Sequence, residues 1–489
     1  MVHSGCVIDR IATFFRLSSR ELTLLVAIFV LSLPAVTLRL YASDEVQYFS
    51  YLRSLWFDRD VSFENEYRHF YESGVARTTL FSKTFIEPAT DTGLRRNFAT
   101  MGSAILWAPF YAVADASVRI ARALGSGVPA DGYSTPYVAA VCLASALYGF
   151  LAILLSIRLA RTFTGDGLPA AAAVWLGTPL LFYMYVAPAF GHAPSAFAVS
   201  VFIVAWLRAR RAWRVADVAL LAAAGALMTM VREQDAFFVA GPAMDYAVTW
   251  WRSRGSASRA GPLVVAGAAA VTFLACLAPQ LAAYRVLNGR FGPSPLVGRK
   301  MTWSSPHAVE VLLSPEHGFF FWTPLAAVGI GGLVWLALSR RGAVTNSAAP
   351  SRQAAVCLLM MVAAAVYVTG SVESWTAAGA FGQRRFVSLT PALTIGLAAL
   401  FARPGTRERA AGFRMAAAAL AGVVALSVWW NLALIAQFGA HLMDRQRLEL
   451  ARNARTAFVT LPIAGPRLAY RYLFDRESFY QPAGPPPVE

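Results

Sequence analysis

The feature that most constrains this chain is a series of long apolar runs that carry almost no charge. An apolar run of about 18 residues or more is typical of a helix that crosses a lipid bilayer. Of the 489 residues, 57% are hydrophobic and only 14% are charged, whereas a soluble domain has about 25% charged residues. The sequence therefore predicts an all-α polytopic membrane protein. We interpret as spans the runs 21–41, 137–158, 168–187, 193–208, 215–231, 235–251, 262–286, 319–338, 354–370, 386–402 and 413–437.

Arginines gather in every second connection between these runs, as they do in cytoplasmic loops. Arg10, Arg16 and Arg20 precede the first run, and no small-residue cleavage site follows it, so we interpret it as a retained span rather than a signal peptide. The amino terminus is then cytoplasmic and the carboxyl terminus lies outside. The basic connections contain Arg158 and Arg161; Arg208, Arg210, Arg211 and Arg214; Arg252, Arg254 and Arg259; Arg340, Arg341 and Arg352; and Arg403, Arg407, Arg409 and Arg414.

The run 98–114, "FATMGSAILWAPFYAVA", is at the lower length limit for a span. An even number of spans must separate Arg20 from Arg158 if both are cytoplasmic, which favours a segment at the outer face that does not cross. The alternative is a full span with one loop that violates the charge rule. With eleven spans, residues 1–437 form the membrane module, 42–136 its first outer loop with juxtamembrane helices, and 438–489 an outer tail.

Two function classes lose support from this topology. The formal net charge of +16 could indicate nucleic-acid binding, but most of the cations lie in predicted cytoplasmic loops, where insertion explains them. Three of the four cysteines lie in apolar runs and no CxxC occurs, so we expect neither a disulfide framework nor a cysteine metal site.

The predicted outer loops collect ionisable residues against the charge rule. An anionic ligand at the lipid interface would explain such cations, since an arginine fork matches phosphate oxygens; headgroup contact or pairing with loop acids such as Glu64, Glu66 and Glu72 would explain them too. The cations are Arg77, Lys83, Arg95, Arg96, Arg299, Lys300, Arg384 and Arg385. His69, His192, His307, His317 and His441 also fall outside, without metal-binding spacing. His192 is the best candidate for substrate contact, because it begins a span between two prolines.

An acid pair, Asp44 and Glu45, follows the first span in "RLYASDEVQYFSYL". Ser43 could cap a helix whose first turn holds both acids, where they complement the helix dipole. Val46, Phe49, Leu52 and Trp56 would share one face of this helix, as in a helix on a membrane surface. Capping accounts for one acid; a carboxylate here could also be the general base for an acceptor hydroxyl.

Several segments resemble the GT-C superfamily of polyprenyl-phosphate-sugar-dependent glycosyltransferases. The first span followed by "SDEVQYFSYLRSL" resembles the first outer loop of that superfamily, and "NFATMGSAILWAPF" a later part of the loop in bacterial members. "GTPLLFYMYVAPAFGHAPSAFAVS", "LLSPEHGFFFWTPL" and "ESWTAAGAFGQRRFVSLTPAL" are similar to bacterial members related to protein O-mannosyltransferases and lipid A aminoarabinose transferases. The resemblance runs from about residue 20 to 400.

The resemblance implies a GT-C-like helical bundle in the bacterial inner membrane with its active site on the outer face. It implies an inverting hexosyl- or pentosyltransferase of the cell envelope that moves a sugar from a polyprenyl phosphate to a lipid, glycan or protein acceptor. Asp44 matches the family's acidic loop residue, with Glu45 beside it, and Lys83 falls where relatives place a phosphate ligand, although "FSKTFIEP" departs from their pattern. No cofactor or metal is implied.

The mechanism that we expect uses Asp44 as general base, with Glu45 orienting the acceptor or sharing that role. Lys83, Arg299, Lys300, Arg384 and Arg385 are the candidate phosphate ligands. Tyr48, His192 and Trp375 are the candidate substrate contacts; Trp303 could also stack on a sugar, although interfacial anchoring would explain each aromatic. The alternatives are a transporter or flippase of an anionic lipid-linked sugar, which would place ionisable groups deep in its spans, and a non-catalytic scaffold. Asp245 is the main ionisable residue within the predicted spans.

Overall fold

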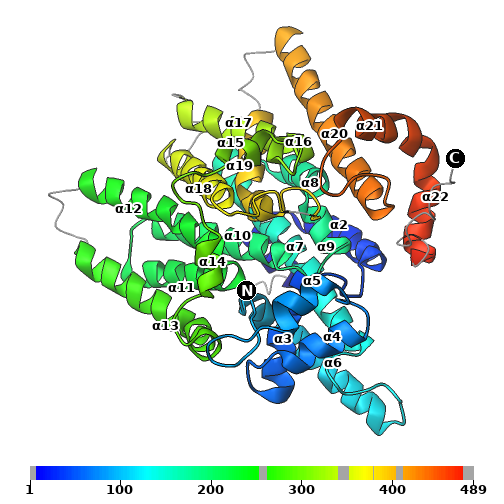
Figure 1. The fold of residues 1–489 in the computed structure, drawn as a ribbon. Helices are drawn as coiled ribbons and strands as arrows, with labels where there is room; N and C mark the ends of the chain where they lie inside the picture. The colour runs from blue at the N-terminus through cyan, green and yellow to red at the C-terminus, as the bar shows by residue number, and fades with distance from the viewer. Residues whose placement is uncertain are drawn as a thin grey trace, which may run out of the picture. The chain divides into compact units, whose positions relative to one another are not determined.

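The protein is built from helices, as the sequence predicts. The computed structural model describes residues 7–252, 261–339, 352–377, 379–402, 411–476 and 479. Ala89 and Arg95 form an isolated β-bridge, and the named elements of these ranges are all helical. The predicted all-α class is confirmed (Figure 1).

The chain forms two compact units, which we describe separately. Unit 1 comprises residues 1–35, 152–186 and 303–489, and unit 2 comprises residues 36–151 and 187–302. Helix α7 (Thr135–Thr164) contributes to both. The other helices of unit 1 are α1 (Val7–Phe15), α2 (Ser19–Ser32), η1 (Leu33–Ala35), α8 (Leu168–Gly177), α9 (Leu180–Tyr185), α15 (Ala308–Leu313), α16 (Phe319–Trp322), α17 (Pro324–Leu338), α18 (Arg352–Gly370), η5 (Arg384–Leu389), α19 (Thr390–Phe401), α20 (Ala411–Gly439), α21 (Leu450–Arg455), η6 (Thr456–Thr460) and α22 (Leu461–Phe474).

Unit 2 contains the first loop and a group of long helices. Its helices are α3 (Ser43–Arg53), η2 (Ser54–Asp58), α4 (Glu64–Glu72), α5 (Thr79–Phe81), η3 (Ser82–Ile86), α6 (Gly102–Ala123), α10 (His192–Ala209), α11 (Val215–Val231), η4 (Glu233–Val239), α12 (Ala240–Arg252), α13 (Pro262–Asn288) and α14 (Pro295–Arg299). Helix α11 packs against both α10 and α13, and α3 packs against α6.

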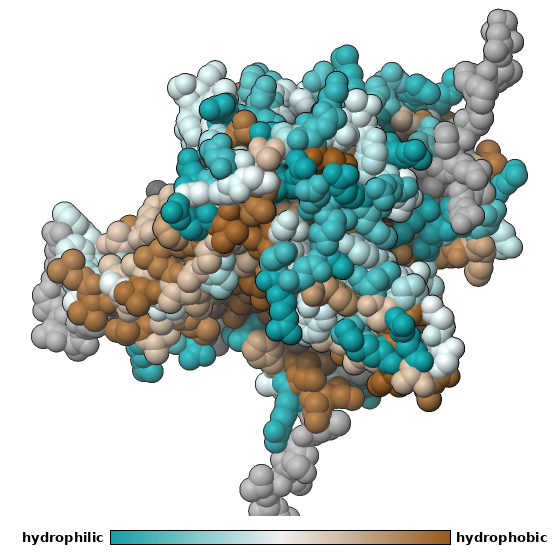
Figure 2. Space-filling view, turned by 60° about the horizontal axis from the view of Figure 1, so that its bottom comes forward, coloured by the Kyte–Doolittle hydropathy of each residue, from teal (hydrophilic) through white to brown (hydrophobic). Residues whose placement is uncertain are grey.

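Each of the eleven predicted spans contains helix, although several are broken. Seven helices in the described ranges are long and apolar enough to cross a membrane, or eight if α1 and α2, which are bent by 91°, count as one span. Three further apolar helices, α8, α11 and α17, are shorter. Large apolar side chains remain exposed on these helices, for example Leu263 and Val271 on α13, and Figure 2 shows broad hydrophobic areas on one face. These are the surfaces expected of a protein that spans a membrane.

Helix α6 is longer than the apolar run that predicted it. It has 22 residues, which extend about 33 Å at 1.5 Å per residue, comparable with the roughly 30 Å of a bilayer core. The additional turns contain Asp115, whose carboxylate accepts from Tyr137 Oη at 2.7 Å and pairs with Arg119 at 2.9 Å. Because these residues are charged, hydropathy alone ends the run too early. That the segment lies at the outer face stays a prediction.

Small residues allow two helices of unit 1 to touch through their backbones. A Cβ atom at Gly332 of α17 would lie 1.9 Å from the carbonyl oxygen of Gly396 in α19. Only glycine allows this approach, and small residues at helix contacts are common among membrane helices.

The break between α8 and α9 is stabilised by a distant side chain. Thr178 has extended backbone angles before Pro179, as a residue before proline prefers. The carbonyl groups freed there need donors, since an unpaired backbone group in a bilayer is costly. Asn431 of α20 is fully buried and donates from Nδ2 to Leu176 O at 2.7 Å and to Thr178 O at 3.1 Å.

A buried ion pair organises the first loop. Arg53 at the end of α3 donates to Glu66 of α4 at 3.0 Å and also pairs with Asp58. Its guanidinium lies 4.6 Å from the ring centre of Tyr133. Burial raises the pKa of Glu66 to about 7, and Arg53 opposes that rise.

Some residues of the predicted basic connections lie outside the described residues: Arg254, Arg259, Arg340, Arg341, Arg403, Arg407 and Arg409. Cys6 also lies outside them. Most of the predicted tail is described, and it forms the hook α21–η6–α22 that follows α20 in Figure 1.

Candidate functional site

The two acids lie in the first turn of α3, as predicted, but their roles in the helix differ. The helix begins at Ser43, with Ala42 as N-cap, so the expectation that Ser43 caps it is wrong. Alanine has no side chain that can accept a hydrogen bond. Glu45 instead binds the chain that enters the helix: its Oε2 accepts from the backbone N–H of Tyr41 at 2.8 Å and of Ala42 at 3.1 Å.

Glu45 is fully buried, whereas Asp44 is half-buried. Burial raises the pKa of Glu45 to about 8; the two backbone donors oppose the rise and the nearby charge of Asp44 adds to it. A carboxyl with this pKa keeps its proton at neutral pH. Asp44 is therefore the better placed of the two to accept a proton.

Helix α3 does not lie on a surface with one apolar face. Val46, Phe49 and Leu52 are buried as expected, but the polar Gln47 and Ser50 are buried as well. Gln47 holds the segment before α6, since its carbonyl oxygen accepts from Asn97 Nδ2 at 3.0 Å and its Oε1 accepts from Phe98 N at 2.9 Å. The helix is therefore an internal part of unit 2.

The residue before His192 brings together two predicted substrate contacts. A Cβ atom at Gly191 would lie 3.0 Å from Tyr48 Cζ and 3.0 Å from Ser103 Oγ. Glycine thus lets the Tyr48 ring of α3 and the first turn of α6 approach the start of α10. Ser103 Oγ is buried and makes no hydrogen bond with any described residue. Such buried polar atoms need a water or a ligand.

His192 contacts a buried arginine that the sequence analysis did not select. Arg232 Nη1 lies 2.9 Å from His192 Nδ1, and the two residues are only 8% and 4% exposed. Arginine can only donate, so Nδ1 accepts and the neutral ring carries its proton on Nε2. The ring also stacks on Phe190, with 5.6 Å between ring centres. Arg232 has no carboxylate within ion-pair distance in the described part of the chain.

The chain around Arg232 is fixed by contacts with two helices and with the residues before α6. Ser195 of α10 donates to Asp235 at 2.6 Å, and Tyr284 of α13 donates to Glu233. Thr100 donates to Val231 O at 3.0 Å. Burial raises the pKa of Glu233 to about 7. We call the residues Glu45, Tyr48, Ser103, His192 and Arg232 the polar cluster.

The polar cluster joins chain segments that were all predicted to lie at the outer face: the start of α3, the residues before α6, the start of α10 and the turn after α11. That these segments share one side of the membrane stays a prediction. Sequence reasoning placed the "REQD" turn (residues 232–235) after the apolar run 215–231, where α11 ends at Val231, but did not select Arg232. The available signal was an ionisable residue directly after a long apolar run.

The candidate phosphate ligands of unit 2 are solvent-exposed. Lys83 lies in η3, and Arg299 and Lys300 lie at the end of α14. Lys300 Nζ is 6.0 Å from the ring centre of Phe98, which is joined to α3 through Gln47. Arg95 pairs with Glu64 at 3.3 Å, so a loop acid accounts for that cation.

The remaining candidates lie in unit 1, in the segment before α19. Arg385 donates to Ser374 O at 2.8 Å, and Trp375 O accepts from Gln383 Nε2 at 2.9 Å. Trp375 stacks on His307, with 5.4 Å between ring centres. Arg384 is half-buried and helps to lower the pKa of His317, which burial brings to about 4.

Two further observations concern the transporter alternative and metal binding. Asp245, the intramembrane acid that most favoured transport, accepts from Arg210 Nε at 2.8 Å and from Trp206 Nε1 at 2.9 Å. Within the described ranges, no three His, Cys, Asp or Glu side chains are arranged to hold a metal ion.

Comparison with known proteins finds a similar fold among the solved structures. No protein family model matches this chain. No curated protein matches it either. Among solved structures, a similar fold is that of ArnT from Cupriavidus metallidurans bound to undecaprenyl phosphate, which is 15% identical in sequence; the match covers 95% of this chain and 75% of that chain, with a TM-score of 0.46.

Proposed function

We propose that this protein is a membrane glycosyltransferase that moves a sugar from a polyprenyl-phosphate donor to an acceptor at the outer face of the bacterial inner membrane. The sequence segments that resemble GT-C glycosyltransferases support this proposal. They include the starts of α3, α6 and α10, which are the segments that meet in the polar cluster. Cell-envelope glycan or glycolipid synthesis is the process that fits best.

The observation that carries the proposal is the buried Arg232. An isolated buried charge costs several kcal/mol unless it is paired. Among the described residues, the hydrogen-bond partner of the Arg232 side chain is a neutral histidine, which cannot neutralise its charge. An anion would, and a phosphate oxygen pair matches the guanidinium fork. Arg232 would therefore bind the donor phosphate, with the exposed Lys83, Arg299 and Lys300 of unit 2 as further candidates. Arg384 and Arg385 of unit 1 are half-buried and stay separate candidates for phosphate binding.

Asp44 is the proposed general base. It accepts the proton of the acceptor hydroxyl or amine while that group forms the new bond to the anomeric carbon. The bond between this carbon and the phosphate oxygen breaks, and the electron pair leaves with the polyprenyl phosphate. Attack on the face opposite the phosphate inverts the anomeric centre. Arg232 stabilises the charge that develops on the leaving phosphate, a preorganised electrostatic contribution.

Glu45 has a supporting role in this proposal. Its protonated carboxyl holds the turn that presents Asp44 and does not compete for the acceptor proton. Tyr48, against Gly191, offers a ring face on which a sugar could stack, and Ser103 Oγ offers a hydrogen bond to a sugar hydroxyl. His192 holds Arg232, and Trp375 remains a candidate substrate contact.

The test is transfer of radiolabelled sugar by the purified full-length protein in lipid nanodiscs, supplied with polyprenyl-phosphate sugars and envelope lipid extract. Arg232→Gln should abolish measurable transfer and donor binding. Arg119→Gln is the matched control, since Arg119 is exposed and lies in a surface ion pair, and it should leave transfer unchanged. Full transfer by Arg232→Gln would refute the assignment of Arg232. Donor lipid that crosses the membrane without sugar transfer would instead identify a flippase.

A further inference from the structure

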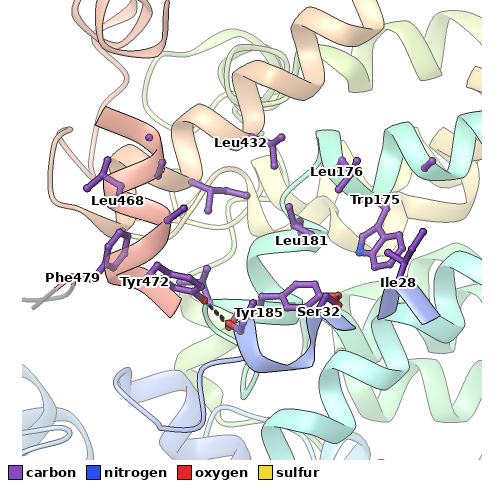
Figure 3. Close-up of a pocket in the computed structure, with 18 of the residues that line it drawn as sticks. Ile28, Ser32, Trp175, Leu176, Leu181, Tyr185, Leu432, Leu468, Tyr472 and Phe479 are labelled. Atoms are coloured by element: carbon purple, nitrogen blue, oxygen red, sulfur yellow. Dashed lines mark hydrogen bonds between the residues drawn. The ribbon is translucent and has the colours of Figure 1, made fainter. Parts of the chain in front are cut away.

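Unit 1 contains an apolar cavity that the proposed transfer reaction does not use. The cavity has a volume of about 510 Å³ and lies among α2, α8, α9, α20 and α22. Figure 3 shows Ile28 and Trp175 on one side, Leu468 and Phe479 on the other, and Leu432 between them. Its walls are almost wholly aliphatic and aromatic.

Helix α22 closes this cavity without packing tightly on the helices behind it. Leu461, at its first position, is its only buried residue in the described range 461–474. The chain before α22 is nevertheless fixed, because Asn453 Nδ2 donates to Gln437 of α20 at 2.9 Å. The chain after it is fixed too, because a Cβ atom at Gly439 would lie 2.7 Å from Phe479 Cε1. The helix is therefore held at both ends across an apolar space.

A few hydroxyl groups border the cavity. Tyr472 Oη donates to Ala35 O at 2.7 Å and lies 3.3 Å from Tyr185 O, and Ser32 Oγ lies 2.7 Å from Tyr185 Oη. Arg476 donates to Pro34 O at 2.8 Å, and its guanidinium lies 4.7 Å from the Tyr472 ring centre. The end at Tyr472 thus combines a hydroxyl group with the positive charge of Arg476, and most of the other lining side chains are apolar.

The depth of the cavity matches one layer of a bilayer. Its wall on α2 and η1 runs from Leu25 to Ala35, which is about 15 Å at 1.5 Å per residue. A bilayer core of about 30 Å contains two layers of acyl chains, so each layer is about 15 Å deep. A long polyprenyl chain would extend well beyond this space, whereas one acyl chain would fill it.

The geometry points to a binding site for a phospholipid: one acyl chain lies in the cavity under α22, and the phosphate headgroup lies at the end formed by Tyr472 and Arg476. This site gives the carboxyl-terminal hook a role as the outer wall of a lipid site. The inference does not depend on the glycosyltransferase proposal, and its test needs no transfer activity.

The test uses the full-length protein in phosphatidylcholine nanodiscs that contain a phosphatidylglycerol with a photoreactive diazirine at the end of one acyl chain. After illumination, mass spectrometry should find the label on peptides that contain Trp175, Leu432 and Leu468. Label spread evenly over the lipid-facing helices would overturn the inference, since ordinary boundary lipid gives that pattern. Removal of the label by polyprenyl phosphate, but not by excess phosphatidylglycerol, would overturn the acyl-chain assignment in favour of a polyprenyl site.

Variants that fill the cavity make the test specific. Ala436→Phe on α20 and Ala172→Phe on α8 both add a ring to the lining and should lower labelling there about tenfold, a change that corresponds to about 1.4 kcal/mol. Ala418→Phe, on an exposed part of α20, is the matched control and should label as the wild type does. Melting curves of all three variants in detergent separate a filled cavity from a misfolded chain. Wild-type labelling in both folded cavity variants would overturn the inference.

Discussion

Arg232 Nη1 lies 2.9 Å from His192 Nδ1 in a buried part of unit 2. The histidine accepts, so it orients the guanidinium without cancelling its charge. This relationship leaves a fixed cation within the polar cluster, where four segments that were predicted to lie at the outer face meet.

His192 is expected to act on donor binding through Arg232. His192→Phe removes the acceptor and should raise the KM for the polyprenyl-phosphate sugar about tenfold or more, since a hydrogen bond to a charged group contributes about 1.5–3 kcal/mol. The value of kcat should fall as well, because Arg232 also stabilises the charge that develops on the leaving phosphate. His192→Asn offers an amide oxygen near the position of Nδ1 and should restore part of the affinity. An unchanged KM in His192→Phe would contradict this positioning role.

The two adjacent acids should differ in their effect on turnover. Asp44→Asn removes the proposed base and should lower kcat about 100- to 10,000-fold, with donor binding retained in a filtration assay. Glu45→Gln keeps an oxygen that can accept from Tyr41 and Ala42 and should retain most of kcat. If Glu45→Gln were the inactive variant and Asp44→Asn the active one, the assignment would be reversed.

Glu45 should also make folding stability depend on pH. Its pKa rises from 4.5 to about 8 on folding, so the folded protein keeps a proton that the unfolded chain has lost. The contribution of Glu45 to the free energy of unfolding is fully present below about pH 4.5. It falls as the pH rises towards 8, by about 1.4 kcal/mol per pH unit. Folding also raises the pKa values of Glu66 and Glu233 to about 7, so these two residues likewise make the stability fall as the pH rises.

The effect of Glu45 is therefore measured by comparing the pH dependence of the melting temperature between variants. Between about pH 5 and about pH 7.5 the melting temperature should fall less in Glu45→Gln than in the wild type. The control is Glu64→Gln. Arg68 and Arg95 lower the pKa of the exposed Glu64, so its contribution is lost only as the pH falls, below this window. Parallel melting profiles for wild type and Glu45→Gln would argue against the raised pKa.

Gly102 should be required for the close contact between α6 and the end of α11. A Cβ atom there would lie 2.3 Å from the carbonyl carbon of Met230 and 2.3 Å from Val231 N. Gly102→Ala should therefore cost about 1–3 kcal/mol of stability, measured as a lower melting temperature, and should weaken donor binding because Arg232 follows directly. Gly127→Ala, which meets no atom within 4 Å, is the control. Equal stability of the two variants would show that α6 can move away.

The spans were predictable because each is a local property of the sequence. Apolar composition located helix in all eleven runs, and the acid pair was correctly placed in a first helical turn. The breaks at Pro179 and Pro324 also had a local signal, since proline lacks an N–H. The length of α6 was underestimated because its last turns contain Asp115, Arg119 and Arg122.

The polar cluster was only partly predictable because its contacts join distant residues. Tyr48 and His192 were selected singly, but their proximity depends on Gly191, whose small size acts only in the folded chain. Arg232 is 40 residues from its partner His192, and the donor Met101 N is 179 residues from Gln280 Oε1. Exposed cations were easier to notice than this one buried cation, whose lack of an acid partner only a structure reveals.

The Asn431 contact has a consequence for biosynthesis. The carbonyl of Thr178 is made 253 residues before the side chain that binds it, which at 5–20 residues per second is a delay of roughly 10 to 50 seconds. During that interval the break after α8 has no partner from α20. The third apolar run thus reaches its final arrangement only after the last one has been inserted, so a chain truncated before Asn431 should leave an early span unfinished.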